Sequence, residues 1–357
     1  MSLAGTRGLI RISLNPECEL QTAMVLDRVR EPEFYKEVTG ETFPGEYGER
    51  VSARRRGVMF ENNLHKDNAA LLRQALGPMF GLDPNNMRVR NLIEEVPEND
   101  LAGRIKRLDL TRSIFRDLAE GRPVPDLLIQ PQLQIITGSG ANDFDHIAPD
   151  FMIFDPSARV FVIGEEKSFI VRNGVGEPAD LDRTRRQAAV QVIALRAEMA
   201  SLGIAERVLN RAVFVFASPH GLHPARPVEE KNLDAEVFEV TRALCVLAES
   251  RERLANRRNH RTIPLPVIAN ELSTSFRDAC MGMCVMVSYC KALAGDTARV
   301  LGNSAADLLG PDTDLTRVSE LLAGASPTNT REAMLAEYLL DAARALSFVD
   351  ASEGSIA

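Results

Sequence analysis

Two short apolar runs joined by a turn form the clearest pattern in the chain, in the segment PDFMIFDPSARVFVIGEEK. The runs occupy residues 151–154 and 160–163, and the Pro and Ser between them favour a tight turn. Such a pair of runs is typical of a β-hairpin. Because side chains alternate along a strand, we expect Glu165 and Lys167 on one face of the second strand and Glu166 on the other.

The patterns on both sides of this hairpin predict an α/β fold. Residues 9–14 and 127–137 have the character of strands, and so does the run AVFVFA at 212–217. Residues 181–202 predict a long helix, because apolar side chains recur along one of its faces. A helix between strands of this kind indicates a sheet that is covered by helices.

The pattern changes to helices from about residue 232 onward. Residues 235–258 and 270–293 are long runs rich in Ala, Leu, Val and Met, and residues 331–346 form another. These runs are more apolar than a lone surface helix needs. We expect them to pack on the core as a bundle and to serve either a homo-oligomer or a partner protein.

Three charged residues mark the hairpin as a candidate site. Asp150 stands at the head of the first strand, so its carboxylate should meet that of Glu165, with the Lys167 amine beside them. Burying unpaired charge costs roughly several kcal/mol, which indicates a bound cation or partner. Two carboxylates and a backbone carbonyl, here that of Glu166, suit Mg²⁺ or Mn²⁺. An ammonium next to such an ion can position water and stabilise a phosphate, so the pattern predicts phosphodiester hydrolysis.

The order Pro-Asp followed by Glu-x-Lys resembles the core motif of the PD-(D/E)XK superfamily, the restriction-endonuclease-like nucleases. The resemblance implies that Asp150 and Glu165 bind the catalytic metal and that Lys167 assists the nucleophile. It also implies a restriction-endonuclease-like core, which is a mixed central sheet flanked by helices. The C-terminal helical region would be appended to this core.

Two features extend the resemblance to particular branches of the superfamily. Arg183, Gln187 and Gln191 form a polar row along the predicted helix, and RecB-like members often carry a Gln there, which implies a catalytic role for Gln187. The segment RGVMFE, which ends at Glu61, resembles the first core helix of Mrr-like members and implies Glu61 as a further metal ligand. Alternatively, the helix around residues 108–120 is the first core helix, and Glu120 takes that place.

These assignments divide the chain into three parts. Residues 1–50 are an N-terminal extension to which the sequence assigns no role. Residues 51–230 are the nuclease core, with an insertion at about residues 78–122. Residues 231–357 are the helical domain, which serves packing, oligomerisation or partner binding.

The charge of the chain is −8 over 357 residues, and its location matters for a nucleic-acid substrate. Residues 301–357 hold nine acidic and three basic side chains, a net charge of −6, which leaves −2 for the rest. Arginines gather at residues 54–56, 104–122, 183–186 and 251–261. Such runs either contact a phosphate backbone or form solvated helix faces. With 5% aromatic residues and no Trp, base stacking has little support, so duplex DNA is favoured and RNA stays open.

The five cysteines are Cys18, Cys245, Cys280, Cys284 and Cys290. An odd number without a paired framework favours a reducing cytoplasm. Cys280 and Cys284 lie one helical turn apart among methionines, and zinc would need two further ligands that are not close in sequence. We therefore interpret this segment as a buried apolar helix. No apolar stretch is long enough to cross a bilayer, so we expect no membrane association.

The sequence therefore predicts a Mg²⁺- or Mn²⁺-dependent endonuclease that acts on DNA in the cytoplasm, in microbial defence, restriction or repair. A second hypothesis is a binding or scaffold subunit that keeps the nuclease fold and is catalytically silent or conditionally activated. The two differ in one respect: only a catalyst needs Asp150 and Glu165 for divalent-metal affinity.

Overall fold

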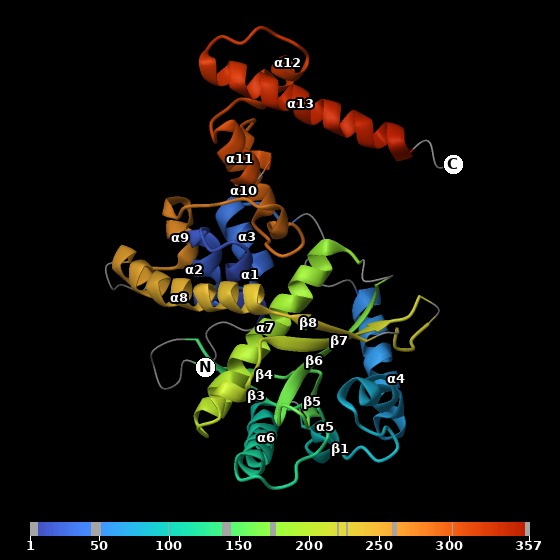
Figure 1. Ribbon diagram of the computed structural model, residues 1–357. Coiled ribbons are helices and arrows are strands. Elements are labelled where there is room, and N and C mark those ends of the chain that lie inside the picture. The colour runs from blue at the N-terminus through green and yellow to red at the C-terminus, as the bar shows by residue number, and fades with distance from the viewer. Residues whose placement is uncertain are drawn as a thin grey trace.

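A mixed six-stranded sheet forms the centre of the molecule, and helices cover both of its faces (Figure 1). In spatial order its strands are β1 (Val89–Asn91), β2 (Leu127–Ile129), β5 (Phe151–Asp155), β6 (Val160–Ile170), β7 (Arg211–Ala217) and β8 (Glu229–Asn232). The pairs β1/β2 and β6/β7 are parallel, and the other neighbours are antiparallel. A second sheet pairs β3 (Leu133–Ile136) with β4 (Phe144–Ile147).

This computed structural model describes residues 6–43, 51–98, 100–137, 144–171, 176–219, 221–225, 228–258, 263–301 and 303–353. The helices within these ranges are α1 (Thr6–Leu14), α2 (Glu19–Asp27), α3 (Glu31–Thr39), α4 (Val51–Leu76), α5 (Leu92–Glu95), α6 (Leu101–Ala119), α7 (Pro178–Ala200), α8 (Asp234–Arg257), α9 (Leu265–Ile268), α10 (Val287–Ala294), α11 (Asn303–Leu309), α12 (Leu315–Leu322) and α13 (Thr330–Glu353). The predicted helices at 181–202, 235–258 and 331–346 are confirmed as α7, α8 and α13, and the predicted strand at 212–217 is confirmed as β7.

The predicted hairpin is confirmed, and its turn is held by one carboxylate. Asp155 accepts hydrogen bonds from the backbone and hydroxyl of Ser157, at 2.8 and 2.6 Å, and it pairs with Arg211 on β7. Although burial opposes ionisation, these donors lower the pKa of Asp155 to about 2. The turn thereby fixes the register of β5 on β6, in which Phe151 lies opposite Gly164.

Gly164 allows the two strands to lie close together immediately before the charged residues. A Cβ at this position would lie 2.0 Å from the ring of Phe151, which is itself fully buried. Only a residue without a side chain fits under that ring. The packing therefore requires glycine next to Glu165.

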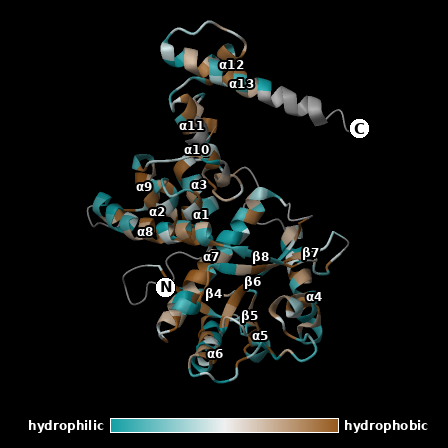
Figure 2. Ribbon diagram, viewed as in Figure 1, coloured by the Kyte–Doolittle hydropathy of each residue, from teal (hydrophilic) through white to brown (hydrophobic). Residues whose placement is uncertain are grey.

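Each face of the sheet carries its own hydrophobic core. On one face, Phe161 and Ile163 pack among residues of α1, α6, α7 and α8. On the other face, Val162 packs with Phe60 and Leu64 of α4. Figure 2 shows hydrophobic residues gathered along the strands and on the helix faces turned towards them. The strict alternation means that Glu165 points towards α7 and Glu166 towards α4.

The prediction of a strand at residues 9–14 is wrong, because this segment is helix α1. Leu9, Ile10 and Ile12 are buried and pack in the core beside α7 and α8. Their β-branched content favoured a strand, but burial against two long helices outweighs such a weak local preference.

The strand predicted at residues 127–137 is two strands in different sheets. The chain turns at Gln130, whose φ is +51°, and its amide donates to the Asp150 carbonyl at 3.0 Å. Residues before the turn form β2 in the main sheet, and those after it form β3 beside β4. The local sequence pattern also fits one continuous strand. Only the pairing of β2 with β5 and of β3 with β4 shows that there are two strands.

The helix predicted at residues 270–293 is also wrong, since only α10 is an α-helix in this segment. The preceding residues bond to the N-terminal part of the chain instead: the carbonyl of Ser273 accepts from the Leu20 amide at 3.2 Å, and that of Ser275 accepts from the Asn15 side chain at 2.6 Å. Gly282 has a φ of +75°, a conformation outside the right-handed helix.

The segment at residues 78–122, predicted as an insertion, contributes to the core. Its strand β1 extends the sheet next to β2. Its helix α6 places Ile114, Phe115 and Leu118 in the same core as α7. The segment therefore adds a strand to the sheet and a helix to one of the layers that cover it.

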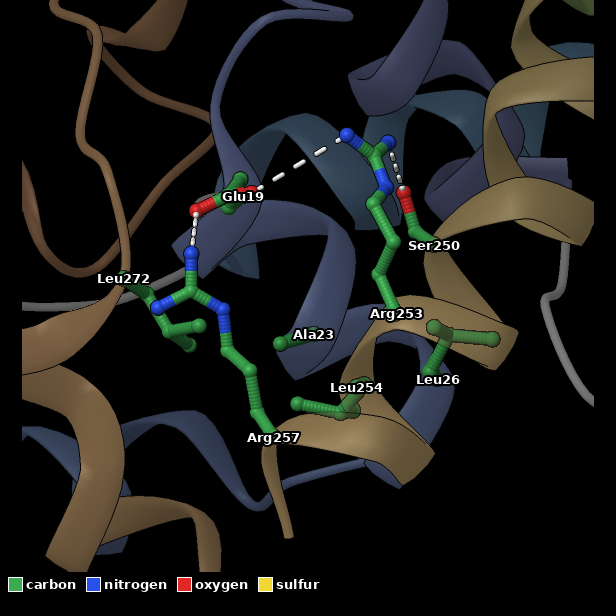
Figure 3. Close-up of a pocket in the computed structure, with 8 residues that line it drawn as sticks. All are labelled: Glu19, Ala23, Leu26, Ser250, Arg253, Leu254, Arg257 and Leu272. Carbon is green, nitrogen blue, oxygen red and sulfur yellow. Dashed lines mark hydrogen bonds and ion pairs between the residues drawn. The ribbon is translucent and has the colours of Figure 1, made fainter. Parts of the chain in front are cut away.

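The N-terminal helices pack against helices from the C-terminal half of the chain. Figure 1 shows α1 to α3 beside α8 and α9. The carboxylate of Glu19, at the start of α2, lies between Arg253 and Arg257 of α8, at 4.0 and 3.1 Å (Figure 3). The N-terminal helices thus form one packed region with α8 and α9 on the α7 side of the sheet.

The last helices lie away from the sheet (Figure 1). A small separate core joins α11, α12 and α13 and includes Leu309, Leu321 and Leu335. Within the ranges given above, no helix has the length and apolar character that a membrane span requires.

Candidate functional site

Asp150, Glu165 and Lys167 meet where β5 begins, beside the second half of β6. The Lys167 ammonium lies 3.5 Å from Asp150 Oδ2 and pairs with Glu165 Oε2. Asp150 Oδ2 also accepts the backbone N–H of Glu166 at 2.8 Å. The hairpin register therefore produces the convergence that the sequence predicts, with the ammonium between two carboxylates.

One side of the cluster is buried in the protein, and the other side is open to solvent. Glu165 is completely buried, whereas the side chains of Asp150 and Lys167 are 14% and 20% exposed. A substrate or ion from solvent would reach Asp150 and Lys167 first. Glu165 lies beneath them, against α7.

Gln191 of α7 binds Glu165 on the buried side of the cluster. Its Nε2 donates to Glu165 Oε1, and its side chain is almost fully buried. Gln187, the glutamine carried over from the resemblance, is half-buried one turn earlier, and its side chain has no hydrogen bond within the part of the chain that the structure describes. The sequence signal for Gln191 was its context, AAVQVIAL, in which a single amide stands among apolar residues.

Glu166 points to the other face of the sheet, where His65 meets it. His65 Nε2, on α4, lies 3.0 Å from Glu166 Oε1. The Glu166 side chain is fully buried, and its Oε2 has no hydrogen-bond partner among the described residues. His65 did not appear among the sequence candidates, because nothing local connects it to a strand 101 positions away.

Glu61 lies one turn before His65 on α4, within electrostatic reach of Glu166 and Lys167. Glu120, the alternative, is exposed at the end of α6 and pairs with Arg122. The structure thus places Glu61, and not Glu120, beside the strand cluster.

Burial and mutual repulsion control the charges of the cluster. Burial, followed by the Asp150 charge, raises the pKa of Glu165 to about 8. Burial also raises the pKa of Glu166 to about 7, although His65 opposes this. Burial alone would lower the pKa of Lys167, but Glu165 and Asp150 outweigh it and raise that pKa. More acidic than basic groups share the space, which favours an additional cation.

The fit of a divalent metal rests on Asp150 and Glu165. Across the described ranges, no group of three or more His, Cys, Asp and Glu side chains is arranged to hold a metal ion. Two carboxylates are nevertheless enough for Mg²⁺, which keeps several of its waters. The Lys167 ammonium lies where a cation would neutralise both carboxylates, so the donors fit a metal once the ammonium moves aside. Metal ligation by Asp150, Glu165, the Glu166 carbonyl and Glu61 stays a prediction.

The comparisons with known proteins add no family to this picture. No protein-family model matches the chain, and no curated protein or solved structure matches it either.

Proposed function

We propose that the chain is a divalent-metal-dependent nuclease built on a restriction-endonuclease-like core. The observation that carries the proposal is the Lys167 ammonium held between Asp150 and Glu165 at the end of a buried hairpin. The mixed central sheet with helices on both faces also agrees with the core that the resemblance implies. Together they support phosphodiester hydrolysis better than any other chemistry the site offers.

In this proposal Asp150 and Glu165 hold Mg²⁺ or Mn²⁺, which would supply Lewis-acid stabilisation of the phosphate and activation of water. Lys167 leaves the carboxylates and places its charge against the attacking water or a phosphate oxygen. Gln191 keeps the Glu165 carboxylate in position through its amide. His65 holds Glu166 on the opposite face.

The substrate proposed is duplex DNA, bound through Arg54, Arg55 and Arg56. These residues are exposed at the start of α4 and have no ion pair within the described ranges. A Cβ on the next residue, Gly57, would lie 3.9 Å from the hydroxyl of Ser168, directly after Lys167. Guanidinium groups next to the site suit phosphate oxygens.

Several arginines of the other runs form ion pairs within the protein. Arg183 pairs with Asp180, Arg186 with Asp182, and Arg258 with Asp27. These ion pairs favour the interpretation of those runs as solvated or structural helix faces. The start of α4 is therefore the preferred phosphate contact.

Cleavage of plasmid, linear duplex, single-stranded DNA and RNA with Mg²⁺ or Mn²⁺ tests the proposal and names the substrate class. Wild-type protein is expected to cut duplex DNA only with the metal, and Asp150→Ala is expected to lose the activity while it stays folded. Absence of cleavage on every substrate by folded wild-type protein would contradict the proposal and favour a scaffold subunit. Cleavage that survives Asp150→Ala would place the chemistry elsewhere.

A further inference from the structure

The first part of α4 turns one face to the sheet and the opposite face to solvent. Phe60 and Leu64 are fully buried in the core on this side of the sheet. Asn63 donates to the carbonyl of Leu222 at 2.8 Å, and His65 contacts the Glu166 carboxylate on β6. These contacts fix the rotation of the helix about its axis, so they also determine which side chains remain exposed.

This part of α4 is a straight helical segment that ends at His65. The next residue, Lys66, has a ψ of 155°, and residues 67–69 have φ values of 52° to 55°. Both conformations lie outside the right-handed helix. Residues 51–65 therefore form a rod that is about 22 Å long.

Two neighbouring rows of side chains run along this rod. One row lies against β6, since a Cβ on its first member would lie 3.9 Å from the Ser168 hydroxyl and its last member contacts Glu166. The row next to it, the outer row, is exposed over its whole length. Residues four apart share a row on a helix, so the row on β6 consists of Gly57, Glu61 and His65, and the outer row of Arg54, Val58 and Asn62.

The outer row and its neighbours combine positive charge with exposed apolar side chains. Val58 and Met59 are each 50% exposed, one turn after Arg54 and Arg55. Between residues 52 and 65 no acidic side chain is exposed. The Asn62 side chain is exposed too, and it has no hydrogen bond within the described ranges. This face is therefore complementary to a polyanion that also offers apolar contacts.

Duplex DNA offers both kinds of contact in its major groove. That groove is about 12 Å wide and admits an α-helix, whereas the minor groove, at about 6 Å, does not. Phosphates line its edges and suit guanidinium groups. Within the groove, thymine presents a methyl group to apolar side chains, and adenine presents a donor and an acceptor that match an asparagine amide.

We propose that the outer row of α4 enters the major groove and recognises A·T base pairs. Asn62 binds adenine through its side-chain amide, and Val58 and Met59 contact thymine methyl groups. Arg54 and Arg55 bind the phosphates at the edge of the groove. The inference rests on the proposed function and narrows its substrate from duplex DNA in general to duplexes that contain A·T pairs.

Binding of short labelled duplexes in the presence of a chelator tests the proposal without cleavage. At one fixed salt concentration, fluorescence anisotropy should give wild-type protein an affinity for an A·T duplex about 10-fold or more above that for a G·C duplex. Uracil in place of thymine removes only the methyl group from the groove. This substitution should weaken binding by wild-type protein.

Single substitutions on the exposed face assign each contact. Asn62→Ala should bind the A·T duplex about 10-fold more weakly, with no change on the G·C duplex. Val58→Ala should bind the thymine and uracil duplexes alike. Arg54→Ala should weaken binding to both sequences equally and lower the salt dependence by about one phosphate contact. The matched control is Val267→Ala, a change of an exposed valine on α9, which should keep the wild-type preference.

Equal affinity of wild-type protein for A·T and G·C duplexes, or no binding to either at low salt, would overturn the proposal. A preference unchanged in both Asn62→Ala and Val58→Ala would do the same. A dimer without sequence preference that Met59→Glu dissociates would assign the face to a second copy of the chain instead.

The outcome for the proposed nuclease is separate. Protein that shows the predicted preference but cuts no DNA with Mg²⁺ or Mn²⁺ would contradict the nuclease and support recognition by α4. Protein that cuts duplex DNA with equal affinity for both sequences would contradict only the recognition.

Discussion

The tripeptide Glu-Glu-Lys occurs twice in the sheet, at residues 165–167 on β6 and at 229–231 on β8. Both copies flank β7, and Glu165 and Glu229 are both in register with Phe214. The first copy lies on a central strand and the second on an edge strand. Identical residues in one sheet therefore differ only in their surroundings.

Those surroundings separate a candidate site from a surface ion pair. Lys231 pairs with Glu229 at 3.1 Å, and its side chain is 38% exposed, so solvent screens the interaction. Lys167 pairs with a completely buried Glu165, and a third charge, Asp150, comes from the neighbouring strand. The two copies of the tripeptide thus differ by burial and by a carboxylate from the neighbouring strand.

Gly164→Val would copy onto β6 the residue that precedes the motif on β8, Val228. Even a Cβ would lie 2.0 Å from the Phe151 ring, so we expect a loss of about 3 kcal/mol or more in the free energy of unfolding. Denaturant unfolding measures it. Gly164→Ala adds only that Cβ, and a Gly164→Ala variant as stable as wild type would contradict the close packing of β5 on β6.

Glu165→Gln should change how stability depends on pH. The folded pKa of about 8 lies above the unfolded value of about 4.3, so the unfolded chain ionises first and stability falls as pH rises between these values. The variant has no carboxyl to ionise and lacks this loss, so its stability relative to wild type should rise from pH 5 to pH 8. The raised pKa of Lys167 stabilises the folded protein to the same extent throughout this pH range, and that stabilisation is lost only at higher pH.

Urea unfolding at pH 5 and pH 8, in the presence of a chelator, measures this effect. The difference between variant and wild type should grow from pH 5 to pH 8. A constant difference would mean that Glu165 is ionised in the folded protein throughout, contrary to its burial.

His65→Ala should remove the partner of a buried carboxylate. Glu166 would lose its contact with Nε2, at a cost of about 1 to 3 kcal/mol. His65→Gln, which retains a donor, should recover part of the loss. In a double-mutant cycle with Glu166→Gln, a coupling energy near zero would show that the contact contributes nothing.

Lys231→Ala should change stability by less than about 0.5 kcal/mol, because the pair on β8 is exposed. Thermal unfolding beside wild type measures it. A loss comparable with that of His65→Ala would remove the distinction between the edge strand and the central strand.

The sequence predicts the elements that depend on near neighbours. The hairpin of β5 and β6 follows from two apolar runs and one turn, and it alone brings Asp150 to Lys167. The helix α7 and the strand β7 also have clear local patterns. For these elements, the pattern of burial and the pattern of the sequence agree.

The errors share a different cause, which is contact between distant segments. Residues 9–14 became helical because α7 and α8 bury them, and residues 270–286 lost their helix to bonds with the N-terminal part. Gln191 and His65 reach their partners only through the complete fold. The spacing of these residues in the sequence does not predict those contacts.

Duplex-DNA cleavage with Mg²⁺ by Lys167→Ala and Lys231→Ala, assayed side by side at equal folded concentration, tests the central claim most directly. The variants make the same change in the two copies of one tripeptide. We predict that Lys167→Ala loses about 100-fold or more in rate, as expected for a group that stabilises transition-state charge, and that Lys231→Ala cuts like wild type. Equal rates for the two variants would contradict the claim that burial beside Asp150 makes the β6 copy the catalytic one.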